Sequence, residues 1–213
     1  FDGYSVAMSD TSLPDSSSAS LASSASTASD GPLMPELPAL VPAPMGGVSV
    51  DLSGEIIEHT RPQAMAALRD MPHLICHRLF TSRRVMPSQW AGRGQNQRPP
   101  LHPSTLDILE LFAFVYPARP CLPTPLGVMR ALELVSRTQE PSPEDLALGL
   151  LHAMQLLLTA AANQPKAAKD HARSLAQLMT HSGWGWGQFV MAALGSGEEG
   201  RRTRGSGYNV WTD

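Results

Sequence analysis

The sequence has little of several residue types that would mark a function class. Only 16% of its 213 residues are charged, 6% are aromatic, and the formal net charge is −3. These values exclude a globally basic nucleic-acid coat and an acidic tail. The two cysteines, Cys76 and Cys121, are too few for a disulfide framework or a four-thiolate zinc site. The apolar runs are expected to fall short of the ~18–20 residues of a membrane span, so we expect a soluble protein of a reducing compartment, the cytoplasm.

Four segments differ in composition. Residues 1–32 are rich in Ser, Ala and Thr and lack the basic and apolar regions of a signal peptide. Such a segment cannot bury enough apolar area to offset about 1–2 kcal/mol of backbone entropy per residue, which predicts disorder. Residues 33–47 are predicted to form a Pro-rich linker, 48–194 one folded domain, and 195–213 a Gly/Arg-rich linker.

Both ends indicate a piece of a longer protein. Met8 opens a stretch typical of a bacterial start, and the seven residues before it are expected to be read-through or added sequence. The last residues, 207–213, contain no helix stop signal and no polar tail. We therefore expect a fragment cut within its parent protein.

Caps and hydrophobic periodicity predict a helix-dominated α/β domain with a few short strands and about five to six helices. Residues 48–57 are expected to form a β-hairpin, and 73–77 a buried strand. Thr60 before Pro62, and Ser142 before Pro143, are predicted helix starts. The candidate helical segments are 60–72, 79–85, 105–116 (with Ser104 as cap), 126–135, 143–162, 165–180 and 188–194, with a loop over 86–103.

The apolar residues of the later segments are expected to form the core. The Met- and Leu-rich stripe within 143–162 is more often core than a partner site. Leu175, Leu178 and Met179 of the predicted helix 165–180 recur at helical spacing and are predicted to face inward. Trp184 and Trp186 are interpreted as a packing plug beside glycines that permit a tight turn.

No motif for catalysis, cofactor binding or metal binding is complete. Residues 195–203 have the outline of a phosphate loop, but Arg201 and Arg202 stand where a Lys and a Ser/Thr are needed. The histidines lack metal-ligand spacing, and Cys76 and His77, adjacent on a predicted strand, would point to opposite faces. We therefore assign no catalytic, cofactor-binding or metal-ligating residue.

One stretch of the sequence is electrostatically unusual. Between Met71 and Leu106 there is no Asp or Glu, while five arginines lie in it. Arginines bind phosphates, and an exposed aromatic side chain can stack on an unpaired base; an ordinary solvated loop is the alternative. The residues predicted to contact DNA are Arg83, Arg84, Trp90, Arg93 and Arg98.

Two stretches resemble a known family. The first is LDILELFAFVYPAR at 106–119, followed by 123–134. The second runs from the Gly-Trp-Gly-Trp-Gly sequence at 183–187 to Trp211. Together they resemble the N-terminal region of the DinG-like, XPD-related ATP-dependent DNA helicases of alphaproteobacteria, over roughly residues 36–213.

The resemblance implies a domain that precedes a superfamily 2 motor. In that family the motor carries the phosphate loop, the DEAH-type box and usually an iron–sulfur cluster. The resemblance thus implies ATP, magnesium and a cluster for the motor, none of them for this fragment, and it implies DNA and the motor in cis as partners.

In some DinG-like proteins the N-terminal domain is a DEDD-type 3′–5′ exonuclease, in which four carboxylates hold two metal ions. Asp107 would match the third acid. Thr81 stands where the acid of a His-Asn-x-x-Phe-Asp stretch belongs, and Asp51 supplies at most one carboxylate of the opening Asp-x-Glu. Two-metal catalysis needs several convergent carboxylates. The resemblance therefore implies a degenerate, non-catalytic exonuclease-like domain.

Three hypotheses follow for the function. The first is an accessory helicase domain that positions DNA or regulates the motor. The second is an active metal-dependent nuclease with Asp51 and Asp107 among its ligands. The third is an interaction or scaffold domain whose helical face over 146–179 docks on the motor or on another protein.

Overall fold

The computed structural model describes residues 32–87 and 101–195, so the predicted disorder of 1–32 falls almost wholly outside the described residues. Within this range the chain forms five strands and seven helices, in an α/β arrangement dominated by helix. The elements are β1 (Ala39–Ala43), β2 (Gly46–Val50), β3 (Ile56–Thr60), α1 (Arg61–Asp70), β4 (Leu74–Ile75), α2 (Arg78–Val85), β5 (Leu106–Asp107), α3 (Ile108–Val115), α4 (Pro125–Ala131), α5 (Pro143–Ala162), α6 (Lys166–His181) and α7 (Gly187–Leu194).

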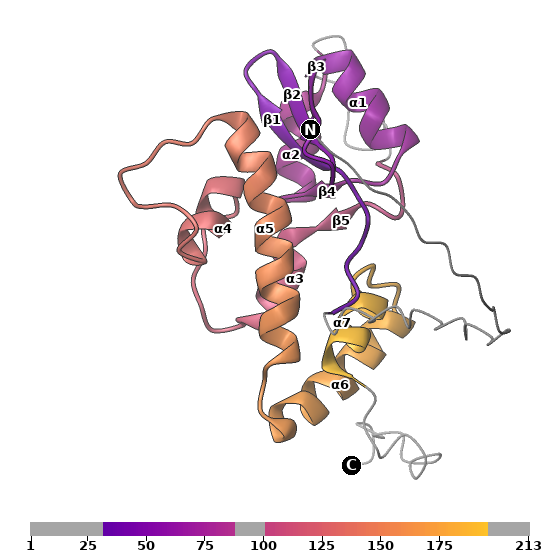
Figure 1. Ribbon diagram of the computed structural model, residues 1–213. Coiled ribbons are helices and arrows are strands. Elements are labelled where there is room, and N and C mark those ends of the chain that lie inside the picture. Colours follow the sequence, from indigo (N-terminus) through magenta and orange to yellow (C-terminus); the bar gives the residue numbers. More distant parts are fainter. Residues whose placement is uncertain (1–31, 88–100, 196–213) are drawn as a thin grey trace, which may run out of the picture. The chain divides into compact units, whose positions relative to one another are not determined.

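The five strands form one mixed sheet in the order β3-β2-β1-β4-β5. β1, β2 and β3 are consecutive antiparallel strands, with Val48 of β2 opposite Val41 on one side and Glu58 on the other. The chain then crosses through α1 to β4 and through α2 to β5, and both of these strands run parallel to β1 (Figure 1). The carboxyl ends of β4 and β5 therefore lie side by side, each followed by a helix.

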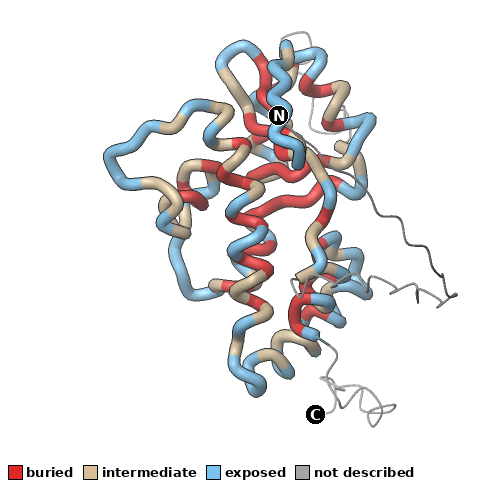
Figure 2. Tube along the Cα trace, viewed as in Figure 1, coloured by how far each residue is buried: buried red, intermediate tan, exposed pale blue. Residues whose placement is uncertain are grey.

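The side chains of the central strands alternate between two apolar layers. Ala39, Val41 and Leu74 join the layer that includes α3, α5 and α7, whereas Leu40 and Ile75 join the layer that includes α1 and α2. All five are fully buried. Figure 2 shows buried residues running through the sheet and along α5. Helices thus cover both faces, which is usual where parallel strands form part of a sheet.

Helix α5 is the long core element of this fold. It has 20 residues and a mean hydropathy of 1.5 over an 18-residue window, so by length and composition it could cross a membrane. The expectation that every apolar run falls short is therefore wrong for this segment. Its apolar residues pack on β1, β2, α3 and α7, and this packing accounts for its composition without a membrane.

Two predicted helix starts are confirmed by their capping bonds. The Thr60 backbone N–H and hydroxyl both donate to Oε1 of Gln63, at 2.9 and 2.7 Å, before α1. The Asp145 N–H donates to the Ser142 hydroxyl oxygen, and the Ser142 N–H donates to the Asp145 carboxylate, before α5. The Ser142–Asp145 bonds are reciprocal and satisfy two backbone N–H groups at the helix start, whereas both Thr60 bonds run to the Gln63 side chain and satisfy one. The hairpin predicted over 48–57 is also present, as β2 and β3.

The Pro-rich segment 33–47 is not a linker, and this interpretation is corrected. It contains β1, the central strand, so the folded domain begins before residue 48. β1 is paired with β4 only through Ala39 opposite Leu74. The missing N–H of Pro42 can therefore face a side of β1 that has no strand partner, which is where a strand tolerates proline.

The helix predicted over 105–116 starts later than expected. Leu106 and Asp107 form β5, and the helix begins at Ile108 with Asp107, not Ser104, as its N-cap. The helix predicted over 126–135 is also shorter, ending at Ala131. Both differences lie at helix ends, where cap geometry rather than apolar periodicity sets the boundary.

Candidate functional site

The most polar buried position of the fold lies where β4 and β5 end. The Asp107 carboxylate accepts three backbone N–H bonds there: from His77 at 2.8 Å, from Arg78 at 2.7 Å and from Leu109 at 3.1 Å. The first two donors belong to the start of α2 and the third to the start of α3. One side chain thus satisfies free N–H groups at two helix N-termini, where negative charge is favourable. Asp107 joins the two strand–helix junctions.

His77 has an unusual backbone conformation at this junction. It lies in the left-handed region, with φ 59°, although it is not glycine. Its ring stacks on Phe80, 6.3 Å between centroids, and its Nδ1 is buried without a hydrogen-bond partner in the part of the chain that the structure describes. The bonds to Asp107 stabilise this backbone conformation, which residues other than glycine rarely adopt.

The two tryptophans of 183–187 pack as predicted. Trp186 is fully buried, and its indole N–H donates to the backbone carbonyl of Asp107 at 2.8 Å. Trp184 lies against Phe114 of α3, with 4.9 Å between the ring centroids. The α6–α7 connection is thereby attached to β5 and α3.

The residues at this junction do not fit a two-metal site. The Asp107 carboxylate is already bonded to three N–H groups, and Thr81, which stands where the resemblance implies an acid, donates its hydroxyl to the Cys76 carbonyl at 2.8 Å. No group of three or more His, Cys, Asp or Glu side chains suited to a metal ion occurs within 32–87 and 101–195. We derive no catalytic step through metal ions here.

Asp51 and Asp107 are not brought together. Val50, Ala39, Leu74 and Leu106 are opposite one another across β2, β1, β4 and β5, so three strand spacings, about 14 Å, separate β2 from β5. The two acids also continue in opposite directions from this row, because β2 and β5 run antiparallel. Metal ions of a two-metal site are about 4 Å apart. Asp51 instead accepts bonds from Ser53 and Glu55 in an exposed turn, and the Ser53 hydroxyl is the main reason that its pKa is lowered.

A groove of about 770 Å³ opens beside this junction, between α3, α6 and the α6–α7 connection. Its wall is mostly apolar, and the polar side chains on it are Arg78, Thr105, Glu110 and Ser182. Six of its lining residues are Arg78, Glu110, Phe114, Leu175, Leu178 and Trp184.

Glu110 and Arg78 are the charged groups of this groove. Glu110 is accessible to solvent, but partial burial raises the pKa of its carboxyl, and the nearby charge of Asp107 raises it further. Arg78 favours the ionised form of Glu110 and donates from Nη2 to the Thr105 carbonyl at 2.7 Å. The Trp184 indole N–H also favours the ionised form, although its geometry falls short of a hydrogen bond. Glu110 was not among the residues predicted from the sequence; its signal was a single acid inside the apolar run 108–115.

Leu175 and Leu178 are not inward-facing, and this prediction is corrected. Leu175 is 44% exposed and Leu178 is 65% exposed, and both line the groove. Helix α6 is amphipathic, but Ala176 is its one buried residue. Met179, also predicted to face inward, is half-buried and lines the groove as well. The apolar periodicity therefore identified an apolar face of the helix that no other element covers within the described residues.

The arginines predicted to contact DNA divide into two groups. Arg83 and Arg84 lie on the last turn of α2, both exposed, and neither forms an ion pair within the described residues. The Arg84 guanidinium lies over the Phe80 ring, 5.3 Å from its centroid. The predicted contacts at Trp90, Arg93 and Arg98 fall outside the described residues.

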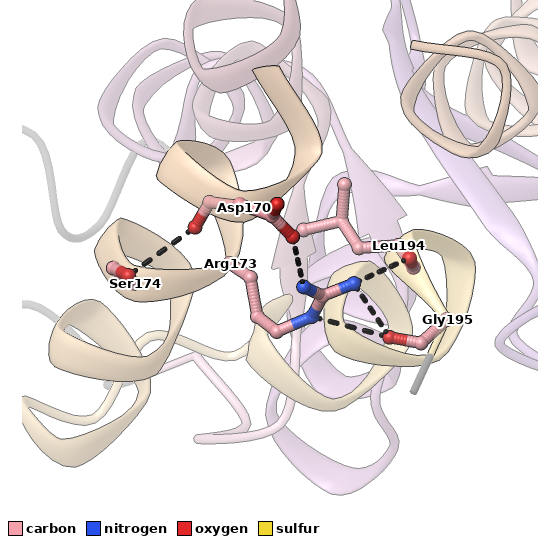
Figure 3. Close-up of polar contacts among 5 residues, drawn as sticks. All are labelled: Asp170, Arg173, Ser174, Leu194 and Gly195. Atoms are coloured by element: carbon pink, nitrogen blue, oxygen red, sulfur yellow. Dashed lines mark hydrogen bonds and ion pairs between the residues drawn. The ribbon is translucent and has the colours of Figure 1, made fainter. Parts of the chain in front are cut away.

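Arg173 of α6 holds the carboxyl end of α7 (Figure 3). Its guanidinium donates to the Leu194 carbonyl at 2.9 Å and to the Gly195 carbonyl from two nitrogens, and it pairs with Asp170 at 2.8 Å. Terminal helix carbonyls lack partners within the helix and favour a cation. Arg173 therefore fixes the point at which the chain leaves α7.

Comparisons of this chain with protein-family models, with curated proteins and with solved structures each give no match.

Proposed function

We propose that this domain is a non-catalytic accessory part of a DinG-like, ATP-dependent DNA helicase of the cytoplasm, and that it positions DNA through α2. The ATP, magnesium and iron–sulfur cluster implied by the resemblance would belong to the motor. The observation that carries DNA contact is the exposure of Arg83 and Arg84 on one helical turn, without a carboxylate partner in the described part of the chain.

The sequence around α2 favours an anionic ligand there. No acidic residue occurs between Asp70 and Asp107, so the arginines of α2 face no local neutralising charge along the chain. The Phe80 ring beneath Arg84 restricts that side chain to a surface position. An arginine guanidinium can donate two parallel hydrogen bonds to one phosphate group. A guanidinium whose motion is already restricted loses less entropy when it binds.

The non-catalytic part of the proposal is supported by the bonds of Asp107. Its three backbone donors make it a structural link between α2 and α3. A carboxylate used in this way has few lone pairs left for metal ions. The active-nuclease hypothesis is therefore the weaker alternative.

The test is the salt dependence of binding to a labelled single-stranded oligonucleotide, measured on the 213-residue chain. Replacing both Arg83 and Arg84 with Ala should weaken binding and lower the salt slope by about 1.4, because each lost phosphate contact on single strands removes about 0.7.

The matched control replaces Arg137 and Lys166, two exposed cations outside α2, with Ala. It changes net charge equally, so it should leave the slope within error of the unchanged chain. Equal slopes for the two double variants would contradict DNA contact through α2.

The groove favours a second candidate function, that of an interaction domain. Its exposed leucines on α6 are part of the 146–179 face proposed for docking. Binding to the motor domains without any affinity for DNA would favour this candidate over the first.

A further inference from the structure

The α6 groove, lined by Arg78, Glu110, Phe114, Leu175, Leu178 and Trp184, combines two properties of a peptide site. Leu178 and Leu175 present large apolar surfaces to solvent on one wall. The Glu110 carboxyl stands at the same groove in surroundings that disfavour its charge, so a cation there would be stabilised. The chemistry that fits is a segment with apolar side chains and a basic residue close by.

We propose that the α6 groove binds the segment 204–211 of the same chain, with Tyr208, Val210 and Trp211 on the apolar wall and Arg204 near Glu110. This inference goes beyond the proposed function and does not depend on DNA binding. The segment has the required composition: its basic residue precedes three large apolar residues, and it contains no acid.

The chain leaves α7 beside the helix that lines the groove. Arg173 holds the Gly195 carbonyl against α6, the same helix that supplies Leu175 and Leu178. Arg173 and Leu175 are two positions apart, about 200° around the helix, so the segment must pass around α6 to reach the groove.

The intervening chain is long enough for this path. Twelve residues, four of them glycine, separate Gly195 from Tyr208. A flexible linker of this length spans roughly 19 Å on average, against a helix diameter of about 10–12 Å. Tethering gives the segment an effective concentration in the millimolar range, so weak contacts are sufficient for binding.

The test is hydrogen exchange of the 213-residue chain, read at residues 178–186 beside the groove. Leu178→Asp puts a charge on the apolar wall, and Trp211→Ala removes the largest apolar group of the segment. Each variant should speed exchange about tenfold. This is the protection that docking would give if the effective concentration is about 1 mM and the dissociation constant of the segment is about 0.1 mM. Because both release the same contact, the double variant should exchange no faster than either single variant.

Three results would overturn the proposal. The first is an unchanged exchange rate in Trp211→Ala. The second is additive effects in the double variant, which would mean that the two residues act independently. The third is protection that grows with protein concentration, which would assign the groove to a second copy of the chain. Leu122→Asp is the matched control, since Leu122 is 68% exposed and does not line the groove.

The charged contact gives an independent readout that leaves the apolar wall intact. Arg204→Glu should speed exchange at 178–186, Glu110→Lys should do the same, and the combined charge swap should restore protection. Failure of the swap to restore protection, with both single variants folded by circular dichroism, would overturn the placement of Arg204 beside Glu110.

Discussion

Helices α5 and α6 follow one another in the chain and are both apolar along one side, but the fold uses them differently. α5 buries eight residues against the sheet and its neighbouring helices, whereas α6 buries only Ala176. Figure 2 shows the contrast, with buried residues along α5 and mostly exposed or half-buried residues along α6. Apolar periodicity therefore reports which side of a helix could be covered, and only the topology determines whether another element covers it.

The difference has a physical origin in where each helix lies. α5 contacts β1 and β2, which carry buried apolar side chains, so its apolar face removes large areas from water. α6 is held mainly to α7, through close approach of Gly187 to the Thr180 side chain and through Arg173. These contacts position α6 but leave Leu175 and Leu178 in solvent, which forms the α6 groove.

The largest expected effect comes from truncating a leucine on each helix. Leu157→Ala in α5 should lower the free energy of unfolding by about 2–5 kcal/mol, because Leu157 is fully buried and its removal leaves a cavity. Leu178→Ala in α6 should lower it by no more than about 1.4 kcal/mol, the free energy of the tenfold docking proposed at the α6 groove, because Leu178 is otherwise 65% exposed. Urea denaturation of both variants measures the difference; similar losses would remove the distinction between the two helices.

The next comparison is between Asp107 and Asp51, the two acids named in the metal-dependent nuclease hypothesis. Asp107→Asn should destabilise the chain by about 2–3 kcal/mol, because an amide accepts the N–H bonds of His77, Arg78 and Leu109 more weakly and places its own N–H₂ against one of them. Asp51→Asn, in an exposed turn, should leave the thermal midpoint almost unchanged. Since removing a carboxylate from a crowded metal site relieves repulsion, a gain in stability in Asp107→Asn would contradict the structural role.

The sequence was most informative where a cap and a periodic run agree. Ser142 and Pro143 before a long apolar pattern predict α5 within its observed bounds, and Thr60 with Pro62 predicts α1 in the same way. Each signal is local, since the capping bonds join residues three positions apart.

The parts that the sequence could not predict depend on contacts between distant residues. β1 was missed because Pro42 within it and the prolines on either side of it suggest a linker, and its place in the sheet depends on β2 and β4. The start of α3 was misplaced because Asp107 bonds to N–H groups 29 and 30 positions away. The exposure of Leu178 follows from the absence, within the described residues, of an element over α6, which no pattern inside 165–180 can reveal.

The smallest expected effects are in the pH dependence of stability. Buried His73 and groove-lining Glu110 should change the free energy of unfolding in opposite directions as the pH falls. His73 is buried, and burial lowers its pKa, with the charges of His59 and His102 adding to the shift, although the bond between its Nδ1–H and the Met71 carbonyl opposes it. The unfolded chain therefore takes up the proton first, and the stability contributed by neutral His73 is lost as the pH falls below about 6.5.

Glu110 in the groove behaves in the opposite way, because its pKa is raised in the folded state. Ionisation at neutral pH opposes folding where no added cation faces Glu110, so in an Arg204→Ala background Glu110→Gln should raise the thermal midpoint slightly at pH 7, and the gain should disappear as the pH falls through the raised pKa. His73→Asn, which keeps an N–H for the Met71 carbonyl, should instead reduce the loss of stability between about pH 7 and 5.5. Thermal melts of each variant against its own parent chain, between about pH 7 and 4 so that the ordinary pKa values of both groups are covered, test the signs. Parallel pH profiles for the two variants would mean that buried His73 and groove-lining Glu110 experience the same electrostatic environment, contrary to their opposite contributions to stability as the pH falls.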